Sequence, residues 1–245
     1  MDHNLHVKIY ADGADIDDML DAYRSGFVSG FTTNPTLMKR AGVTDYVAFA
    51  REVVEKIPDL PLSFEVFADD FTTMEKEAEK IHSFGKNVFI KIPITNTKGE
   101  SSIPLIRKLQ DKGYSLNITA ILTTKQVEET VDALNPDVEN IVSVFAGRIA
   151  DSGRDPIPYM KKAVELCNQK KGAHLLWASS RELFNVYEAD RLGVAIITCT
   201  PAIIEKLKKV GKTLEQVSLD TVKGFNKDIQ SLGYTILTEE EISSK

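Results

Sequence analysis

The sequence alternates short, β-rich apolar runs with longer segments of helical period. Two of the runs, VFIKIPI at residues 88–94 and VAIITC at residues 194–199, are apolar on both faces. Runs of that kind are typical of parallel strands that are covered by helices. The pattern therefore predicts repeated βα units and an α/β fold. The predicted strands are residues 7–12, 27–34, 61–68, 88–95, 115–122, 140–147, 173–180 and 194–200.

Glycines give the period of this repeat. Five predicted helices end at or beside a glycine, where a left-handed C-cap is expected. These glycines are Gly26, Gly85, Gly113, Gly172 and Gly193. The first four follow one another at intervals of about 60, about 30 and about 60 residues, and a unit of about 30 residues is one βα module. Eight such units predict a single (β/α)8 TIM barrel with an additional C-terminal helix.

An open, doubly wound sheet is the alternative to the barrel. A sheet of that type usually has a glycine-rich phosphate loop after its first strand. Here the corresponding segment, YADGADID, contains one glycine and no G-x-G-x-x-G motif. Eight units within about 200 residues also favour closure into a barrel.

The length and the C-terminal pattern predict one barrel domain over residues 1–245. Residues 213–235 are predicted to form the additional helix, with one apolar face made of Val222, Phe225, Ile229 and Leu232. That face packs either on its own barrel or on a neighbouring subunit, and the sequence leaves both interpretations open.

Composition excludes several classes of protein. The net charge of −6 argues against a nucleic-acid partner, which calls for a basic face. Two cysteines, Cys167 and Cys199, are too few for a disulfide framework and indicate a reducing compartment. No secretory signal begins the sequence, and the most apolar stretch, residues 192–204, is too short to span a bilayer. A cytoplasmic protein with no membrane partner is expected.

Polar residues interrupt nearly every apolar run near its C-terminal end, where barrel enzymes build their active sites. These residues are Asp12, Thr33, Asn34, Glu65, Lys91, Asn117, Thr119, Ser143, Arg148, Ser179 and Arg181. A barrel interior that served packing alone would carry branched apolar side chains at these positions. The pattern therefore predicts a polar site at this end of the barrel.

Lys91 is the most informative of these residues. It lies in Phe-Ile-Lys-Ile-Pro-Ile, where a buried ammonium is costly. Desolvation lowers the pKa of a buried lysine, and the free amine can then attack a carbonyl carbon. The alternative is a structural lysine that is ion-paired with Asp12 or Glu65. The polar residues on the other strands favour the nucleophile.

Asp12 and Glu65 are candidates for general acid and base. Asp12 alone is weak support, because aspartate is common at strand ends and as a helix N-cap. Arg181, which is expected to begin a helix after Ala-Ser-Ser, suits an anion site, although a helix cap with a surface arginine is the simpler alternative. Metal chemistry finds no support, since His3, His6, His82 and His174 show no pair at ligand spacing.

Several motifs resemble the transaldolase family (class I, Schiff-base), in its compact transaldolase and fructose-6-phosphate aldolase-like subgroup. The resemblance extends from residue 7 to about residue 230, and TTNPT followed by the KIP motif is specific. The motifs are YAD at 10–12, TTNPT at 32–36, FEV at 64–66, IKIP at 90–93 with Thr95, NITA at 117–120, VFAGRI at 144–149 with Asp151, and ASSR at 178–181.

The resemblance implies a role for each matching residue. Lys91 is the Schiff-base lysine, Asp12 moves the hydroxyl proton during C–C cleavage, and Glu65 with Thr119 positions a catalytic water. The residues implied to hold the substrate are Thr33, Asn34, Asn117, Ser143, Phe145, Arg148, Ser179 and Arg181. It also implies sugar-phosphate substrates, no metal or organic cofactor, a place in the pentose phosphate pathway and a homo-oligomer.

Two reactions compete within this family. A transaldolase passes a dihydroxyacetone unit from fructose 6-phosphate or sedoheptulose 7-phosphate to an aldose phosphate, whereas a fructose-6-phosphate aldolase releases dihydroxyacetone. The resemblance implies tyrosine and glutamine in the aldolases at the positions of Phe145 and Glu65, so both residues favour the transaldolase. Val144 and Ser180 depart from the usual motifs of the family. Ser180 lies in the motif that is implied to bind the substrate phosphate. A sugar-phosphate-binding barrel without catalysis is the remaining alternative.

Overall fold

A closed barrel of eight parallel strands forms the centre of the computed structural model, which describes residues 5–237 and 241–242. Each strand pairs with the next along the chain, and β1 pairs with β8 to close the barrel. This confirms the predicted (β/α)8 barrel. The strands are β1 (Lys8–Asp12), β2 (Gly30–Thr32), β3 (Leu62–Glu65), β4 (Val88–Pro93), β5 (Leu116–Ile121), β6 (Asn140–Val144), β7 (Ala173–Trp177) and β8 (Ile196–Cys199).

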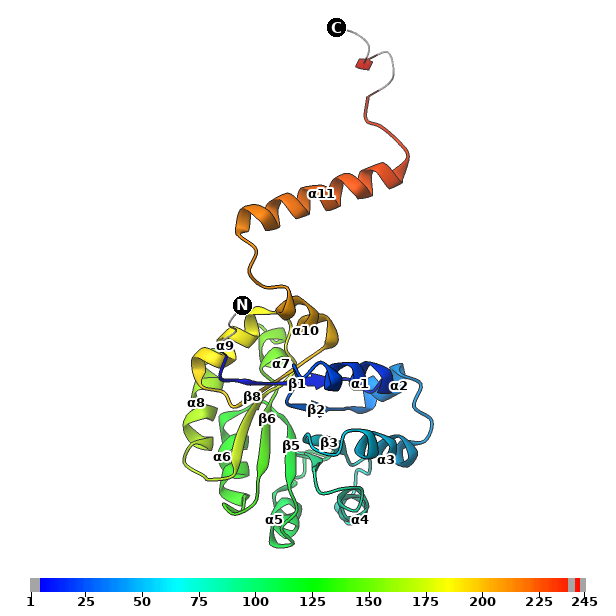
Figure 1. Ribbon diagram of the computed structural model, residues 1–245. Helices are drawn as coiled ribbons and strands as arrows, with labels where there is room; N and C mark the ends of the chain where they lie inside the picture. The colour runs from blue at the N-terminus through cyan, green and yellow to red at the C-terminus, as the bar shows by residue number, and fades with distance from the viewer. Residues whose placement is uncertain (1–4, 238–240, 243–245) are drawn as a thin grey trace. The chain divides into compact units, whose positions relative to one another are not determined.

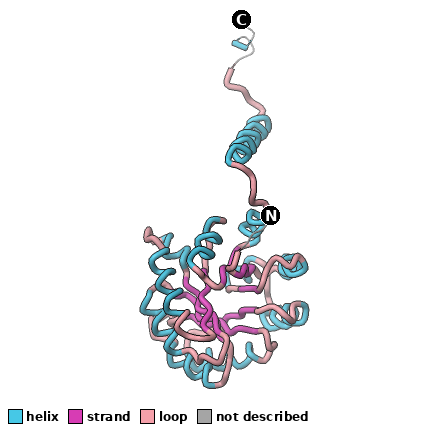
Figure 2. Tube along the Cα trace, turned by 60° about the vertical axis from the view of Figure 1, so that its left-hand side comes forward, coloured by secondary structure: helices cyan, strands magenta, loops and turns pink. Residues whose placement is uncertain are grey.

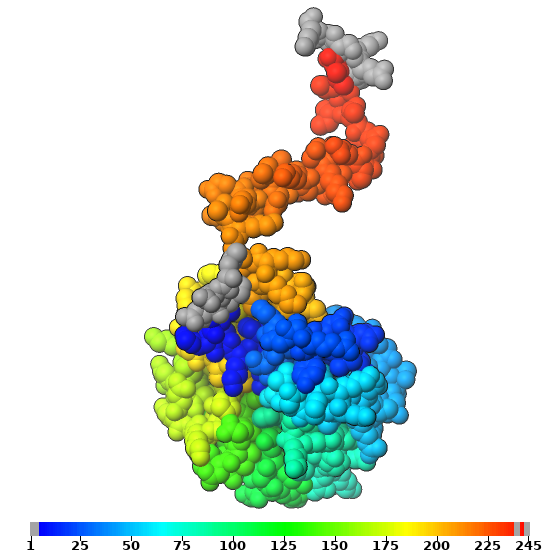
Figure 3. All heavy atoms as spheres, viewed as in Figure 1, coloured from blue at the N-terminus to red at the C-terminus, as the bar shows by residue number. Residues whose placement is uncertain are grey.

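Helices surround the strands of the barrel (Figures 1 and 2). In the space-filling view, the blue residues of the first βα unit lie beside the yellow and amber residues of the last (Figure 3). The helices of the barrel are α1 (Ile16–Arg24), α2 (Pro35–Arg40), α3 (Tyr46–Lys56), α4 (Phe71–His82), α5 (Ile103–Asp111), α6 (Thr124–Ala133), α7 (Ala146–Asp151), α8 (Ile157–Cys167), α9 (Phe184–Leu192) and α10 (Pro201–Lys208).

The short helices α2 and α7 are absent from the sequence-based expectation. Both follow a strand directly, so they lie at the end of the barrel where a site was predicted. The start of α2 has a local cause: the Asn34 side chain accepts a hydrogen bond of 3.0 Å from the Leu37 amide, and Pro35 is pre-set for the first helical turn. A six-residue helix is too short to show a periodic apolar face, so periodicity does not reveal it.

The glycine prediction is correct at four of the five positions. Gly26, Gly113, Gly172 and Gly193 have positive φ angles of 65°, 74°, 78° and 76°. Gly85 does not. A side chain there would bring its Cβ to 2.6 Å from Val54 Cγ1, so this glycine allows α3 to approach closely rather than reversing the chain.

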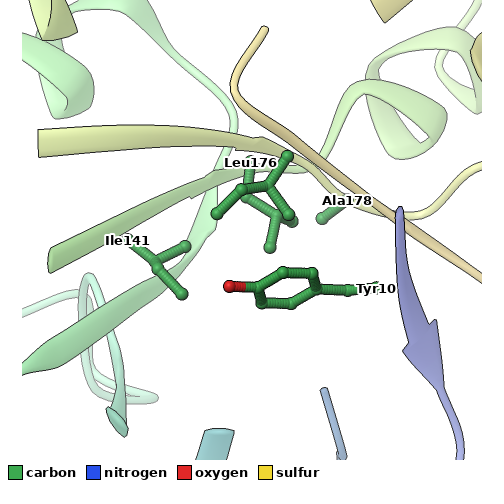
Figure 4. Close-up of a cluster of buried hydrophobic side chains, with 5 residues drawn as sticks. Tyr10, Ile141, Leu176 and Ala178 are labelled. Carbon is green, nitrogen blue, oxygen red and sulfur yellow. The ribbon is translucent and has the colours of Figure 1, made fainter. Parts of the chain in front are cut away.

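Alternation along the strands decides which side chains enter the barrel. In β4, Ile90 and Ile92 are fully buried under the helices, whereas Lys91 between them points inward. Tyr10 of β1 points inward in the same way and packs on Ile141 and Leu176 (Figure 4). Burial raises the pKa of Tyr10 to about 12, as expected for a phenol that serves packing.

The backbone takes an unusual conformation at two positions at the C-terminal end of the barrel. Ala120 and Ser179 have φ angles of 61° and 60°, which non-glycine residues rarely adopt. The pairing of β5 with β6 shifts register between Ile118 and Ile121, around Ala120. Strain of this kind concentrates at functional sites, and both residues line the cavity described below.

The described residues from 208 onward form a compact unit of their own. It contains α11 (Leu214–Leu232), which lies within the predicted 213–235 and begins with a capping box of Thr213 and Gln216. None of its side chains is buried, and Val222, Phe225, Ile229 and Leu232 are 55–64% exposed. The surface that this apolar face packs against stays a prediction. No described helix is long and apolar enough to cross a membrane.

Candidate active site

A cavity of about 480 Å³ opens at the C-terminal ends of the strands. It brings together every predicted site residue except Thr33, from seven different strands and the segments after them. The predicted residues that line it are Asp12, Asn34, Glu65, Lys91, Asn117, Thr119, Ser143, Phe145, Arg148, Ser179 and Arg181. Cys167 and Cys199 are buried free thiols outside the lining, and burial raises the pKa of each to about 12.

The Lys91 ammonium lies in the wall of this cavity with an exposure of 7%. Its Nζ is 3.2 Å from Glu65 Oε2 and donates a hydrogen bond of 2.9 Å to the Thr33 carbonyl oxygen. The ion pair with Glu65 that the structural alternative requires is therefore present. Both partners of the pair also line the cavity, so the amine is accessible from it.

Asp12 is half-buried beside a pair of hydroxyls. Thr32 donates a hydrogen bond of 2.9 Å to Asp12 Oδ1, and the Thr32 and Thr198 hydroxyl oxygens are 2.5 Å apart. Burial has the largest effect on the pKa of Asp12 and raises it, and the Glu65 charge raises it slightly further. The Lys91 charge and the Thr32 hydrogen bond lower this pKa, but by less than burial raises it. A carboxyl group with a raised pKa is suited to accepting and returning a proton.

The side chains of Asn117 in β5 and Ser143 in β6 form a hydrogen-bonded polar pair on the cavity lining. The Ser143 hydroxyl donates to Asn117 Oδ1 at 2.6 Å, and Asn117 Nδ2 donates to the Ser63 hydroxyl at 3.0 Å. These contacts assign the orientation of the Asn117 amide and use one of its two N–H donors. The second N–H has no partner among the described residues and is available to a ligand.

Thr119 has a buried hydroxyl without a hydrogen-bond partner among the described residues. Leaving such a group unpaired costs about 1–3 kcal/mol, so a buried hydroxyl at a cavity wall is a position for a ligand or a water molecule. Glu65 lines the same cavity, and its strand is separated from that of Thr119 only by β4.

Arg148 and Arg181 line the cavity after β6 and β7. The Arg148 guanidinium lies 5.8 Å from the centre of the Phe145 ring, within the range of a cation–π contact. Arg181 forms a two-pronged ion pair with Asp151, which lowers the Asp151 pKa through hydrogen bonding and charge. Arg181 precedes α9 rather than beginning it, and its backbone amide is held by the Asn185 side chain at 2.8 Å.

Gly147 sets the spacing between these arginines. A Cβ atom at this position would lie 1.7 Å from the Ser179 carbonyl oxygen, so only glycine allows α7 to approach the turn after β7. Arg148 follows this glycine directly, and Ser179 lies two residues before Arg181. The close approach therefore joins the two sequence motifs into one arginine-rich wall.

Strand alternation explains why Thr33 lies outside the lining. Its hydroxyl donates to the Ser63 carbonyl oxygen at 2.9 Å, away from the cavity, and only its own carbonyl reaches Lys91. Thr32 has the same inward parity as Asn34 and lines the cavity in its place. Sequence reasoning also missed Thr198 and Arg40 in the lining. Because side chains two residues apart in a strand point to the same face, the position of Asn34 predicts that Thr32, not Thr33, lines the cavity.

No cluster of three or more histidine, cysteine, aspartate or glutamate residues suited to a metal ion occurs among the described residues. Of the four histidines, His3 lies outside the described residues, and none of the other three lines the cavity.

Comparison with known proteins identifies the family. Residues 9–236 match the family described as Transaldolase/Fructose-6-phosphate aldolase. The chain belongs to this family. Two similar relatives are the probable transaldolase of Erythrobacter litoralis, 30% identical, and that of Sphingopyxis alaskensis, 32% identical. Both alignments cover 94% of this chain and 100% of the relative. The predicted family membership is therefore confirmed.

Solved structures support the fold of this family member. The barrel is similar to 3-hexulose-6-phosphate synthase from Salmonella typhimurium, with a TM-score of 0.53 and 15% identity over 80% of this chain and 90% of that chain. It is also similar to 3-keto-L-gulonate-6-phosphate decarboxylase from Vibrio cholerae, with a TM-score of 0.52 and 12% identity over 81% of this chain and 89% of that chain. At these identities the similarity shows the barrel fold alone.

Proposed function

We propose that this chain is a transaldolase that transfers a dihydroxyacetone unit from a ketose phosphate, fructose 6-phosphate or sedoheptulose 7-phosphate, to an aldose phosphate through a Schiff base on Lys91. The observation that carries the proposal is the position of the Lys91 amine. It is nearly buried, faces the cavity, and has Glu65 beside it and Asp12 on the same lining.

The first half of the reaction forms the covalent bond. Glu65 accepts a proton from Lys91 Nζ, and the neutral amine attacks C2 of the ketose. The C2 oxygen then takes up one proton from the attacking nitrogen and the proton held by Glu65, and it leaves as water. The nitrogen and C2 form an iminium ion. A water molecule between Glu65 and the unpaired Thr119 hydroxyl serves as the proton carrier in these steps.

The second half breaks and remakes the C3–C4 bond. Asp12 accepts the proton of the C4 hydroxyl, C4 leaves as the aldehyde, and the electron pair of the broken bond flows into the iminium to form an enamine. An acceptor aldehyde then reacts in the reverse sense and takes the proton from Asp12. Water adds to C2 of the new iminium, the C2–Nζ bond breaks, and the product ketose leaves Lys91. The raised pKa of Asp12 suits both directions, because the carboxylate must be basic enough to accept the proton.

The two ends of the substrate are held by different walls. Asn34, Asn117 and Ser143 provide hydrogen-bonding groups for the hydroxyls of the dihydroxyacetone unit. Arg148, Ser179 and Arg181 provide the anion site for the phosphate. We assign the enzyme to the pentose phosphate pathway in the cytoplasm on the same chemistry, because this reaction interconverts the sugar phosphates of that pathway.

The test of the proposal is borohydride reduction in the presence of fructose 6-phosphate, followed by peptide mass mapping. Reduction of the iminium gives a stable secondary amine, and the adduct is expected on Lys91. Lys91→Met, which keeps most of the side-chain volume, is the matched control and should give no adduct. Absence of an adduct from the unaltered enzyme would exclude the Schiff base.

We also propose that the enzyme assembles with copies of itself through α11. The supporting observation is its row of four exposed apolar side chains, Val222, Phe225, Ile229 and Leu232. An apolar helix face of this kind is stable in water only when another surface covers it.

A further inference from the structure

Arg40 lies on the cavity lining, and the proposed mechanism gives it no role. It is the last residue of α2, the short helix that begins at the Asn34 N-cap. Its side chain is exposed and forms no ion pair or hydrogen bond with any of the described residues. A charged side chain that lines a polar cavity without a partner is available to a ligand.

The charges of the other two arginines are not equally available. The Arg181 guanidinium is paired with the Asp151 carboxylate through both of its oxygens, so the pair is neutral as a unit. Arg148 contacts the Phe145 ring, which carries no net charge. A sugar phosphate carries a charge of about −1.5 to −2 at pH 7. Of the three arginines, Arg148 and Arg40 form no ion pair with a carboxylate among the described residues, although the Arg148 charge also acts on Asp151.

Arg40 lies on a different side of the barrel from the other two arginines. Arg40 follows β2, whereas Arg148 and Arg181 follow β6 and β7, on the other side of the closed strand order. All three line one cavity, so the cavity presents arginines from two sides of the barrel. The neighbouring Lys39 is also exposed and also lies in the last turn of α2, but it does not line the cavity. Lys39 therefore carries the same charge as Arg40 at the C-terminus of α2, but it has no access to a ligand in the cavity.

We infer that Arg40 is a specificity-determining residue, which binds the phosphate of the substrate from the β2 side and supplies a positive charge that no carboxylate pairs. This rests on the proposed function for the identity of the anion. It places the requirement for a phosphorylated substrate on α2 as well as on the segments after β6 and β7.

The experiment compares two donors that form the same Schiff base. Fructose 6-phosphate carries the phosphate, and dihydroxyacetone does not. The half-saturating concentration of each is measured by borohydride trapping for the unaltered enzyme, Arg40→Ala, Arg40→Lys and Lys39→Ala. Binding of inorganic phosphate to each protein is measured in parallel by isothermal titration calorimetry.

For Arg40→Ala we expect the half-saturating concentration of fructose 6-phosphate to rise about fivefold to tenfold, as for loss of one charged hydrogen bond at an exposed site. That of dihydroxyacetone should stay unchanged. The half-saturating concentration of fructose 6-phosphate for Arg40→Lys should lie between those of the unaltered enzyme and Arg40→Ala. That of Lys39→Ala should equal the value of the unaltered enzyme. Inorganic phosphate should bind more weakly to Arg40→Ala by a similar factor.

Equal behaviour of Arg40→Ala and the unaltered enzyme toward fructose 6-phosphate and inorganic phosphate would overturn the inference. So would an equal shift for both donors, or the same shift in Lys39→Ala. These outcomes are distinct from failure of the proposed function. If the unaltered enzyme gave no adduct with either donor, the Schiff-base mechanism would fail, while the inorganic phosphate titration would still decide the role of Arg40.

Discussion

Thr32 donates a hydrogen bond of 2.9 Å from its hydroxyl to Asp12 Oδ1, and this contact joins the first two strands on the lining of the cavity. The Thr32 proton is used in this bond, so Thr198, 2.5 Å behind it, is the donor of the second contact. Three strands, β8, β2 and β1, thus contribute to one chain of groups that ends at the proposed proton-transfer carboxylate. The chain favours the ionised form of Asp12 against the effect of burial.

Thr32→Val is expected to raise the pKa of Asp12 further and to lower kcat about tenfold, because a donor to the carboxylate is lost. The acidic limb of the pH profile of kcat/KM should move to higher pH. Thr32→Ser keeps the hydroxyl and should retain the position of that limb. A profile that is the same in the valine variant and the unaltered enzyme would remove Thr32 from the mechanism.

Asp12→Asn is expected to stabilise the fold while it abolishes turnover. Because the folded state holds the Asp12 proton more tightly than the unfolded chain, stability falls as pH rises from the ordinary value of 3.8 through the raised value. At pH 7 the variant should therefore be more stable than the unaltered protein. Urea unfolding at several pH values checks this. The difference from the unaltered protein should shrink toward pH 4, and a variant that is less stable at pH 7 would contradict the prediction.

Gly147→Ala is expected to damage the arginine-rich wall. The new Cβ would lie 1.7 Å from the Ser179 carbonyl oxygen, so α7 or the turn after β7 must move. We expect a loss of about 1–3 kcal/mol in stability and an increase in KM for phosphorylated substrates. Gly13→Ala is the control, because a Cβ there meets nothing within 4 Å. Equal thermal unfolding temperatures for the two variants would contradict the close approach.

Phe145→Tyr is expected to shift the reaction from transfer toward hydrolysis. The phenyl ring lines the cavity and cannot hydrogen-bond water, whereas a phenol can hold a water molecule beside the covalent intermediate. Release of free dihydroxyacetone from fructose 6-phosphate, measured without an acceptor, should rise in the variant. Phe145→Leu, which adds no hydroxyl, should show no such rise. If the unaltered enzyme already released dihydroxyacetone as fast as it transferred it, the aldolase alternative would be preferred.

Phe225→Glu is expected to dissociate the proposed homo-oligomer. It places a charge in the middle of the exposed apolar face of α11, where a second copy is proposed to pack. Multi-angle light scattering should show a smaller particle than for the unaltered protein. Lys227→Glu changes the same helix outside the apolar row Val222, Phe225, Ile229 and Leu232, and should leave the mass unchanged. A monomeric unaltered protein would exclude the assembly.

Much of the barrel is predictable from local pattern. Apolar runs such as Ile90–Ile94, the glycines at helix ends and the interval between them report the βα unit directly, because each unit forms from neighbouring residues. The chain order of the units then predicts which strand ends meet. This is why Lys91, Asp12 and Glu65 were selected from sequence and line one cavity in the structure.

Other features depend on contacts between distant residues. Gly85 shows no positive φ because its role is the approach of Val54, and Gly147 is required by the Ser179 carbonyl. Neither neighbour is visible from the local sequence. Arg40 escaped notice because α2 is too short to show a period.

The sequence by itself determined the repeat, the closed barrel and the strand residues that carry the proposed chemistry, since these follow from periodicity and from the rule that parallel strands end at one edge. Only the tertiary structure decided which of two adjacent threonines enters the cavity, which partner holds Asp12, and which arginine keeps an uncompensated charge. The physical reason is that inward parity, pairing and charge compensation are set by side chains from other strands, which closure of the barrel brings together.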